Sequence, residues 1–198
     1  MLVTLEGIDG AGKTTLYKGL KEKLTDLRPL FTREPGSPYI GDAVRHAISK
    51  NSDPLVEAAL FVADHAVHLA TVIRPALEAK KLIISDRYTD SRYAYQQISL
   101  KGVHPDPKAW LAAVHEGWSI VPDMTFLLLI SPDAAMSRVS DRGGKEHFEK
   151  AEFLAEVQKN YLELVAENPS RFVLIDATQK PETILDFVEK SIRERNAK

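Results

Sequence analysis

The stretch that decides the fold is residues 7–14, which read Gly7-Ile8-Asp9-Gly10-Ala11-Gly12-Lys13-Thr14. This stretch fits the pattern Gly-x-x-x-x-Gly-Lys-Ser/Thr in full. The glycines let the backbone curl so that successive N–H groups point at phosphate oxygens, and a following helix presents its positive end to the same anion. Lys13 can then reach the terminal phosphates, and the Thr14 hydroxyl can ligate Mg²⁺. The stretch therefore predicts a phosphate-binding loop.

The residues on both sides of this loop supply the context that it requires. The apolar run Leu2–Leu5 precedes it and predicts a buried strand, and the amphipathic segment Thr14–Asp26 follows it and predicts a helix. Chance alone produces the pattern in on the order of one in a hundred chains of this length. A strand, the loop and a helix in this order favour binding of a nucleoside triphosphate.

Outward from the loop, short apolar runs alternate with segments of helical periodicity. The runs that predict strands are Leu2–Leu5, Pro29–Thr32 (the weakest), Lys81–Ser85, Met124–Ile130 and Arg171–Ile175. The segments that predict helices are Thr14–Asp26, Ile40–Ser49, Pro54–Ala79, Pro107–Gly117, Pro132–Val139, Lys150–Ala166 and Pro181–Arg195. This alternation is typical of βαβ units with right-handed crossovers. It predicts one α/β domain over residues 1–198, a three-layer α/β/α structure with a five-stranded, mostly parallel sheet of the P-loop NTPase type.

Composition and charge exclude several classes of function. The 26 basic and 28 acidic residues give a formal net charge of −2, which argues against a dedicated nucleic-acid binder. The chain has no cysteine, so disulfides and thiolate catalysis are excluded. The start of the chain resembles a strand rather than a signal peptide, and no uninterrupted run reaches the roughly 18 apolar residues of a membrane span. We therefore expect a cytoplasmic protein that binds neither nucleic acid nor membrane.

One predicted helix, Pro54–Ala79, is apolar almost all round. Its polar positions form a single stripe that comprises Glu57, Asp64, His68, Thr71 and Glu78. A helix of this kind is buried on most sides, either in the core of its own subunit or against a second subunit. Its length and apolar character favour the second arrangement, so we expect a homodimer formed through this helix.

A second candidate site follows the third predicted strand, which ends in Ser85-Asp86-Arg87. A carboxylate at this place beside a phosphate loop suits Mg²⁺, directly or through water, and Arg87 could clamp an acceptor phosphate with two hydrogen bonds. An ordinary surface ion pair would give the same pattern. Because the chain is short and has no guanine-reading Asn-Lys-x-Asp run, a small-molecule kinase is favoured over a GTPase.

Further runs accompany the loop in a defined order. They are Leu5-Glu6-Gly7-Ile8-Asp9-Gly10-Ala11-Gly12-Lys13-Thr14-Thr15; Thr32-Arg33-Glu34-Pro35-Gly36; Phe61-Val62-Ala63-Asp64; Asp86-Arg87-Tyr88 with Ser91 and Ala94-Tyr95-Gln96; Pro122-Asp123-Met124-Thr125; and Phe148-Glu149 ahead of Tyr161-Leu162-Glu163-Leu164. In this order and spacing, they resemble the thymidylate kinases along almost the whole chain.

The resemblance implies roles for individual residues around the acceptor. Asp9 would hold the 3′-hydroxyl and help to organise the metal, and Arg33 and Arg87 would grip the acceptor phosphate. Phe61 would stack on the thymine ring, and Tyr95 would pack against the deoxyribose. The acceptor site implied is Asp9, Arg33, Phe61, His65, Arg87, Ser91, Arg92 and Tyr95. The ATP site implied is Gly7, Ile8, Asp9, Gly10, Ala11, Gly12, Lys13, Thr14, Thr15, Arg138 and Ala177.

The basic segment at about 138–149 resembles the lid of a kinase. It contains paired glycines suited to a hinge, and it would deliver Arg142 to the transferred phosphoryl group, assisted by Arg138 or Lys145. The catalytic set implied is therefore Asp9, Lys13, Arg87 and Arg142. Thr14 and Asp86 would hold the metal, with Asp9 and Glu149 as further candidates. Glu149 could equally be a first-turn helix carboxylate.

Three positions depart from the family pattern. His65 stands where the family has an arginine that reads the thymine O4, Arg92 replaces a small or amide residue, and His147 replaces an arginine in the lid. Phe61 and His65 share one helix face, because they are four residues apart. We hypothesise that Arg92 takes over the base contact and that His65 assists it, so that affinity would fall as His65 loses its proton between pH 5.5 and 8. The alternative is that His65 only packs.

The expected reaction follows from the loop and the resemblance together: ATP and dTMP give ADP and dTDP with Mg²⁺. Two alternatives remain open at this stage. One is a nucleoside monophosphate kinase with relaxed or different base specificity, and the other is a non-catalytic P-loop protein that only binds nucleotide.

Overall fold

The computed structural model describes residues 1–140 and 151–197. Its strands are β1 (Leu2–Glu6), β2 (Leu30–Arg33), β3 (Ile83–Asp86), β4 (Met124–Leu129) and β5 (Phe172–Asp176). Its α-helices are α1 (Lys13–Lys23), α2 (Ile40–Ser49), α3 (Pro54–His68), α4 (Arg74–Glu78), α5 (Thr89–Ser99), α6 (Pro107–His115), α7 (Pro132–Ser140), α8 (Ala151–Glu167) and α9 (Pro181–Asn196). A 3₁₀ turn, η1, covers Thr25–Leu27, and a π-helical turn, η2, covers Leu69–Ile73.

The five strands form one parallel sheet in the order β2-β3-β1-β4-β5. This confirms the predicted α/β class, and the sheet is parallel throughout. Leu5 on β1 and Arg33 on β2 both lie in register with Asp86 on β3. The carboxyl ends of the three strands therefore finish at one edge, where ligands bind in sheets of this type.

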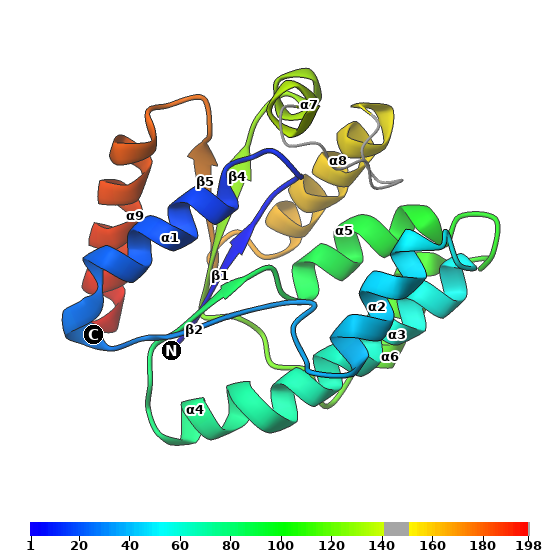
Figure 1. Cartoon of the computed structure of the whole chain (residues 1–198), viewed down its shortest axis with the longest axis horizontal. Helices are drawn as coiled ribbons and strands as arrows, with labels where there is room; N and C mark the ends of the chain where they lie inside the picture. The colour runs from blue at the N-terminus through cyan, green and yellow to red at the C-terminus, as the bar shows by residue number, and fades with distance from the viewer. Residues whose placement is uncertain (141–150, 198) are drawn as a thin grey trace.

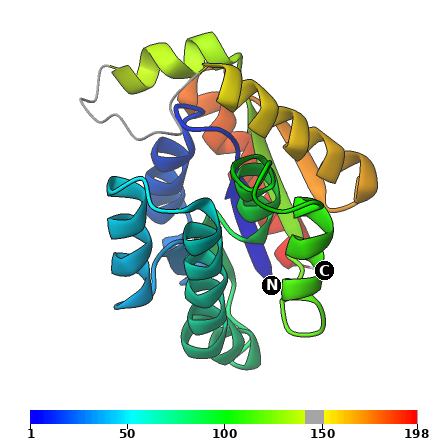
Figure 2. The same cartoon turned by 90° about the vertical axis from the view of Figure 1, so that its right-hand side faces the viewer.

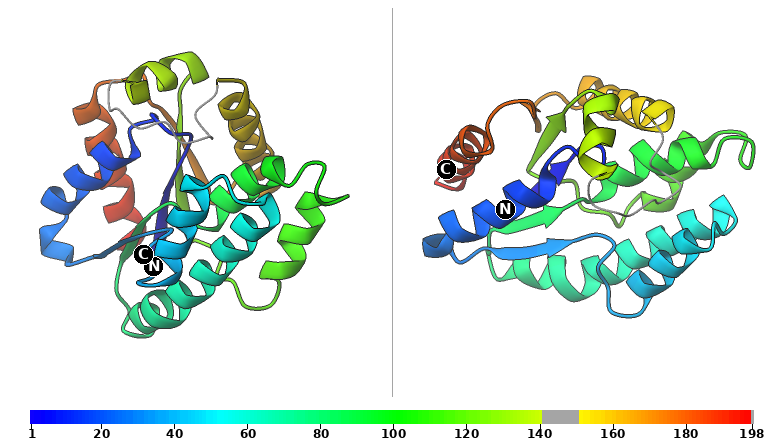
Figure 3. Two further views of the ribbon diagram at one scale, coloured as in Figure 1. Left: turned by 45° about the vertical axis from the view of Figure 1, so that its right-hand side comes forward. Right: turned by 45° about the horizontal axis from the view of Figure 1, so that its top comes forward.

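Helices cover both faces of the sheet and give the predicted three layers (Figure 1). Helices α1 and α9 pack together on one face, and α5 and α8 pack together on the other. Helices α2 and α3 lie side by side beyond β2 and β3 (Figure 3). Because both faces are covered, every residue of β1 is buried.

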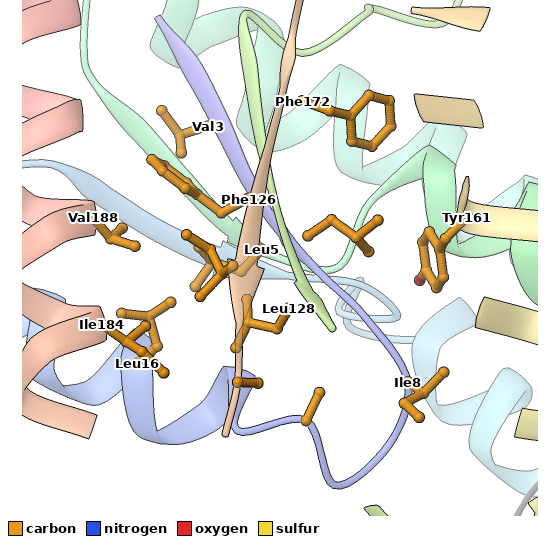
Figure 4. Close-up of a cluster of buried hydrophobic side chains, with 14 of the residues drawn as sticks. Val3, Leu5, Ile8, Leu16, Phe126, Leu128, Tyr161, Phe172, Ile184 and Val188 are labelled. Carbon is orange, nitrogen blue, oxygen red and sulfur yellow. The ribbon is translucent and has the colours of Figure 1, made fainter. Parts of the chain in front are cut away.

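The main core fills the space on both sides of β1 and β4 (Figure 4). Leu16 from α1 and Ile184 and Val188 from α9 lie on one side of these strands, and Tyr161 from α8 lies on the other. This packing holds the strand ends, and the loops that leave them, in fixed positions.

The predicted helix Pro54–Ala79 is present as one helical segment, Pro54–Glu78. It consists of α3, the π turn η2 and α4, which follow one another without a break. By length and by the mean hydropathy of its most apolar 18-residue window, 1.5, this helix could cross a bilayer. Helices packed within globular folds meet the same two criteria. The buried side of α3 carries Glu57, Asp64, His65 and His68. Leu55 and Val56, in contrast, are 42% and 50% exposed, so α3 has a largely polar inner side and an apolar outer side. Beyond α3 the same helix buries Leu69, Ile73 and Ala76.

Helix α5 was not among the predicted helices, although it carries several of the predicted site residues. Its buried side is largely polar, with Asp90, Ser91, Arg92 and Gln96 among the buried residues, so hydrophobic periodicity does not reveal it. Most of the predicted lid, including Arg142, Lys145, His147 and Glu149, lies outside the residues that the structure describes.

Candidate active site

The phosphate loop joins β1 to α1 and contains three glycines with positive φ. Gly7 has φ 137°, and a Cβ built there would lie 2.5 Å from the Leu128 carbonyl oxygen. Gly10 has φ 84°, and its Cβ would lie 2.3 Å from the Ala135 carbonyl oxygen. Both positions therefore require glycine, because a side chain would collide with the backbone of β4 or α7.

Lys13 is the first residue of α1 and is buried beneath the loop. Its Nζ donates hydrogen bonds of 2.8 Å to the carbonyl oxygens of Gly7 and Ile8. Burial, with the neighbouring charge of Arg87, lowers the pKa of Lys13 to about 8. The Ile8 side chain lies in the core, so this residue reaches the site only through its backbone.

A cavity of about 350 Å³ opens at the carboxyl edge of the sheet. Its lining residues come from the phosphate loop and from the β2, β3, α2, α3 and α5 regions. They are Asp9, Gly10, Gly12, Lys13, Thr14, Arg33, Glu34, Pro35, Arg45, Ile48, Phe61, Asp86, Arg87, Ser91, Arg92, Tyr95 and Gln96. The cavity thus brings together every predicted acceptor residue except His65. The sequence analysis assigned no role to Arg45, Ile48 or Gln96.

Asp9 and Arg87 form the centre of the cavity wall. Arg87 Nη2 lies 2.5 Å from Asp9 Oδ1, and the Tyr95 hydroxyl donates to Asp9 Oδ2 at 3.1 Å. Although burial favours the neutral acid, the charges of Arg87 and Lys13 hold the pKa of Asp9 at about 2. The Arg87 guanidinium also lies over the Tyr95 ring, 4.9 Å from its centroid. Three predicted residues are thereby locked in one arrangement.

A buried carboxylate, Glu6, supports Arg87 from behind. Glu6 accepts hydrogen bonds from the Tyr88 backbone N–H and from the hydroxyls of Ser91 and Tyr161, at 2.7, 2.6 and 2.8 Å. Ser91 Oγ in turn accepts from Arg87 Nη1 at 3.1 Å. Burial, and next the charge of Asp90, raises the pKa of Glu6 to about 7. Glu6 belongs to the run Leu5–Thr15 that resembles the thymidylate kinases, but no role was predicted for it.

Arg33, the last residue of β2, lines the cavity, and the loop that follows it is held in place by Asp64 from α3. Asp64 accepts hydrogen bonds from the backbone N–H groups of Gly36 and Ser37, at 3.1 and 2.9 Å, and from the Ser37 hydroxyl. These contacts use a buried carboxylate to fix backbone donors that would otherwise be unpaired. Arg33 is thereby placed beside the phosphate loop.

At the far side of the cavity, Arg92 and Phe61 face each other from α5 and α3. The Arg92 guanidinium lies 5.5 Å from the centroid of the Phe61 ring, within range of a cation–π contact. His65 lies behind them, with no exposed surface. Its ring nitrogens contact Glu34 Oε1 at 2.8 Å and Ser119 Oγ at 2.9 Å. The structure therefore brings Arg92, but not His65, to the cavity wall.

The predicted metal ligands fit a magnesium ion in chemistry. Asp86 Oδ1 is buried and has no hydrogen-bond partner among the described residues, and Asp86 lines the cavity with Thr14. Mg²⁺ is commonly held by one or two protein oxygens together with substrate phosphates and water. The described residues contain no cluster of three or more His, Cys, Asp or Glu side chains that could hold a metal ion by themselves.

A second cavity, of about 470 Å³, lies on the other side of the phosphate loop. Arg138 and Ala177, both predicted to contact ATP, line it with Gly10, Gly12 and Thr15. Arg138 Nη2 donates to the Ala177 carbonyl oxygen at 3.2 Å. Its helix, α7, lies over the phosphate loop (Figure 2). The two cavities share Gly10 and Gly12, so ligands in them would meet at the loop.

Comparison with known proteins identifies the family of the chain. The thymidylate kinase family model matches residues 5–188. The chain is 70% identical to a probable thymidylate kinase of Methanocorpusculum labreanum over 98% of both chains. It is 54% identical to a protein of the same name from Methanospirillum hungatei, over 98% of this chain and 95% of the relative. A probable thymidylate kinase of Natronomonas pharaonis is 44% identical over 97% of both chains. The chain belongs to the thymidylate kinase family.

Proposed function

We propose that this protein transfers the γ-phosphoryl group of ATP to dTMP and releases ADP and dTDP. The observation that carries the proposal is the pair of cavities that meet at the phosphate loop. One of them is lined by five cationic side chains, Lys13, Arg33, Arg45, Arg87 and Arg92. An oxygen of the acceptor phosphate attacks the γ-phosphorus. The bond from this phosphorus to the β,γ-bridging oxygen breaks, and ADP leaves with the electron pair.

Lys13 and the loop backbone stabilise the charge on the transferred group, and Arg87 and Arg33 hold the acceptor phosphate in line with it. Asp9 fixes Arg87 and is available to the 3′-hydroxyl of the sugar. Thr14 and Asp86 would hold Mg²⁺, which supplies Lewis-acid stabilisation of the phosphate oxygens when bound. Arg142 remains our proposal for the lid cation.

Phe61 and Arg92 form the base end of the acceptor cavity, and we assign Arg92 to the thymine O4. Its guanidinium is 2% exposed and lines the cavity. We no longer assign His65 a contact with the base, because it does not line the cavity and both of its ring nitrogens are engaged by Glu34 and Ser119. His65 supports the site from behind instead.

We also propose that the protein is a cytoplasmic homodimer. The outer side of α3 exposes Leu55, Val56, Ala59 and Ala66, while the inner side of the same helix is polar. A second copy of this face would cover it, as a two-fold interface pairs identical surfaces.

An assay of ADP release tests the function, with ATP, Mg²⁺ and a panel of acceptors: dTMP, dUMP, dGMP, dCMP, AMP and thymidine. The proposal expects preference for dTMP, and loss of turnover in Arg87→Ala. Activity spread over many monophosphates would indicate a relaxed nucleoside monophosphate kinase. ATP binding without turnover on any acceptor would indicate a non-catalytic nucleotide-binding protein.

A further inference from the structure

A cluster of buried charged and imidazole groups adjoins the base end of the acceptor cavity, which Glu34 and Arg92 line. Glu34, at its centre, is 4% exposed. Its Oε1 contacts the Nδ1 atoms of His65 and His68 at 2.8 and 2.6 Å, and its Oε2 lies 2.5 Å from Arg92 Nη2. Two histidines and an arginine from two different helices therefore converge on one carboxylate.

Hydrogen bonding within the cluster fixes the orientation of both histidines around Glu34. Both Nδ1 atoms must donate to Glu34, because a carboxylate only accepts. The Nε2 atoms lie 2.7 Å (His68) and 2.9 Å (His65) from the hydroxyls of Thr32 and Ser119, which can donate or accept. Every ring nitrogen therefore has a partner. The ion pair of the cluster joins Glu34 to Arg92.

Arg92 is held on several sides but keeps donor capacity. Its Nε and Nη1 donate to the carbonyl oxygens of Phe61 and Tyr88, at 3.3 and 2.9 Å. The contact between Nη2 and Glu34 is an ion pair outside hydrogen-bond geometry, and Nη2 makes no hydrogen bond within the described part of the chain. A guanidinium has five N–H groups, so an N–H remains for a ligand in the cavity that Arg92 lines.

The two ends of the cavity differ in charge. At the phosphate end, four cationic side chains outnumber two carboxylates: Lys13, Arg33, Arg45 and Arg87 against Asp9 and Asp86. At the base end, the guanidinium of Arg92 is balanced by Glu34. A phosphate dianion therefore gains little at Arg92, whereas a neutral carbonyl can accept its N–H at small cost.

We propose that Glu34 is a positioning residue for base selection: anchored by His65 and His68, it holds Arg92 as a charge-balanced donor that accepts a pyrimidine with a 4-carbonyl and rejects one with a 4-amino group. The inference rests on the proposed function. A guanidinium only donates, so the 4-amino group of dCMP would place donor against donor. Thymine and uracil both carry the 4-carbonyl, so this device separates dTMP and dUMP from dCMP.

The test is Glu34→Gln, assayed at varied dTMP or dCMP with saturating ATP. A glutamine is neutral and cannot balance the positive charge of Arg92. The NH₂ group of its amide would also face another donor, either the guanidinium or a histidine N–H. We expect KM for dTMP to rise, the ratio of kcat/KM for dTMP over dCMP to fall roughly ten- to a hundredfold, and kcat to stay within about threefold, because the groups at the phosphate end are unchanged. The matched control is Glu156→Gln, which removes only an exposed ion pair with Lys101.

A double-mutant cycle keeps the inference falsifiable if the buried change reduces stability. Arg92→Gln and the double variant Glu34→Gln/Arg92→Gln remove the charge that Glu34 balances, so in that background Glu34→Gln should no longer change the ratio. A ratio that stays at the wild-type value in Glu34→Gln, or an equal effect of Glu34→Gln in both backgrounds, would overturn the inference. Wild-type protein that phosphorylates no nucleotide would overturn the proposed function instead.

Discussion

Asp9 and Arg87 lie 78 positions apart in the chain, yet their side chains form an ion pair of 2.5 Å across the carboxyl edge of the sheet. Arg87 also bonds to the Gly7 carbonyl oxygen at 3.2 Å, so one guanidinium ties β3 to the phosphate loop. Arg87 has φ 66°, a left-handed conformation that directs its side chain back over the loop. The geometry of the proposed acceptor phosphate site depends on this contact.

Replacing Arg87 by lysine should therefore reduce kcat strongly while the fold is kept. Lysine retains the charge but cannot contact Asp9, Ser91 and a phosphate with one planar group. We expect a fall on the order of a hundredfold in kcat, with a small change in the KM for ATP. Steady-state kinetics with dTMP measures it, and a variant with more than about a third of wild-type kcat would contradict it.

Lys13 should take up a proton when a nucleotide binds at alkaline pH. Its pKa of about 8, lowered by burial, means that much of the free protein carries a neutral amine above that pH. Phosphate oxygens favour the charged form, so the KM for ATP should rise as the pH increases from 7 to 9. Calorimetry of ADP binding at pH 8.5, in buffers of different ionisation enthalpy, should show proton uptake that Lys13→Met lacks. Binding without proton uptake would contradict this assignment.

Glu6 should make stability depend on pH in a direction unusual for a carboxylate. Its folded pKa of about 7 lies above the ordinary value of 4.5, so the folded state binds the proton more tightly than the unfolded state. Its contribution to stability is present below pH 4.5 and is lost as the pH rises through about 7. Relative to wild type, Glu6→Gln should therefore gain thermal stability as the pH rises from 5 to 8. A difference in melting temperature that is independent of pH would refute this prediction.

His65 should not titrate in the range where the enzyme is normally assayed. Burial lowers the pKa of His65 from 6.5, with Glu34 opposing this effect. The phosphate of dTMP itself titrates near pH 6, so the useful readout is the ratio of KM for dTMP between His65→Asn and wild type. This ratio should stay constant between pH 6.5 and 8. A ratio that changes with pH would restore the hypothesis that a charged His65 reads the base.

Ala66 lies on the exposed outer side of α3, and a charge there should disrupt the proposed dimer. Ala66→Glu should sediment as a monomer in analytical ultracentrifugation, because a buried unpaired carboxylate opposes association. Ala155→Glu is the matched control, since Ala155 is also an exposed helical alanine, on α8. A wild-type protein that is already monomeric, or an Ala66→Glu variant that remains dimeric, would exclude this interface.

The sequence predicted the elements that local pattern controls. The phosphate loop is contiguous, so its glycines and Lys13 could be identified from spacing alone. The strands were recognised because a fully covered parallel sheet requires uninterrupted apolar runs. The site edge followed from the same topology, because Asp86 and Arg33 end neighbouring parallel strands.

The sequence could not predict contacts between residues that are far apart in the chain, or contacts made by polar side chains that are buried where apolar ones are usual. Helix α5 escaped detection because polar residues form its buried side, and Glu6 gained its role only through Ser91 and Tyr161, which lie 85 and 155 positions away. The place of His65 was inferred from its spacing to Phe61, which fixes the helix face but not the direction of a ring.

The amino-acid sequence by itself determined the family, the parallel α/β fold and the phosphate loop, because these depend on short-range periodicity and on contiguous motifs. Only the tertiary structure decided that Arg92 reaches the cavity while His65 turns away to Glu34 and Ser119. The physical reason is that a buried carboxylate must be satisfied. Glu34 gathers the donors that surround it, and which donors these are depends on how α3 and α5 pack against the end of β2.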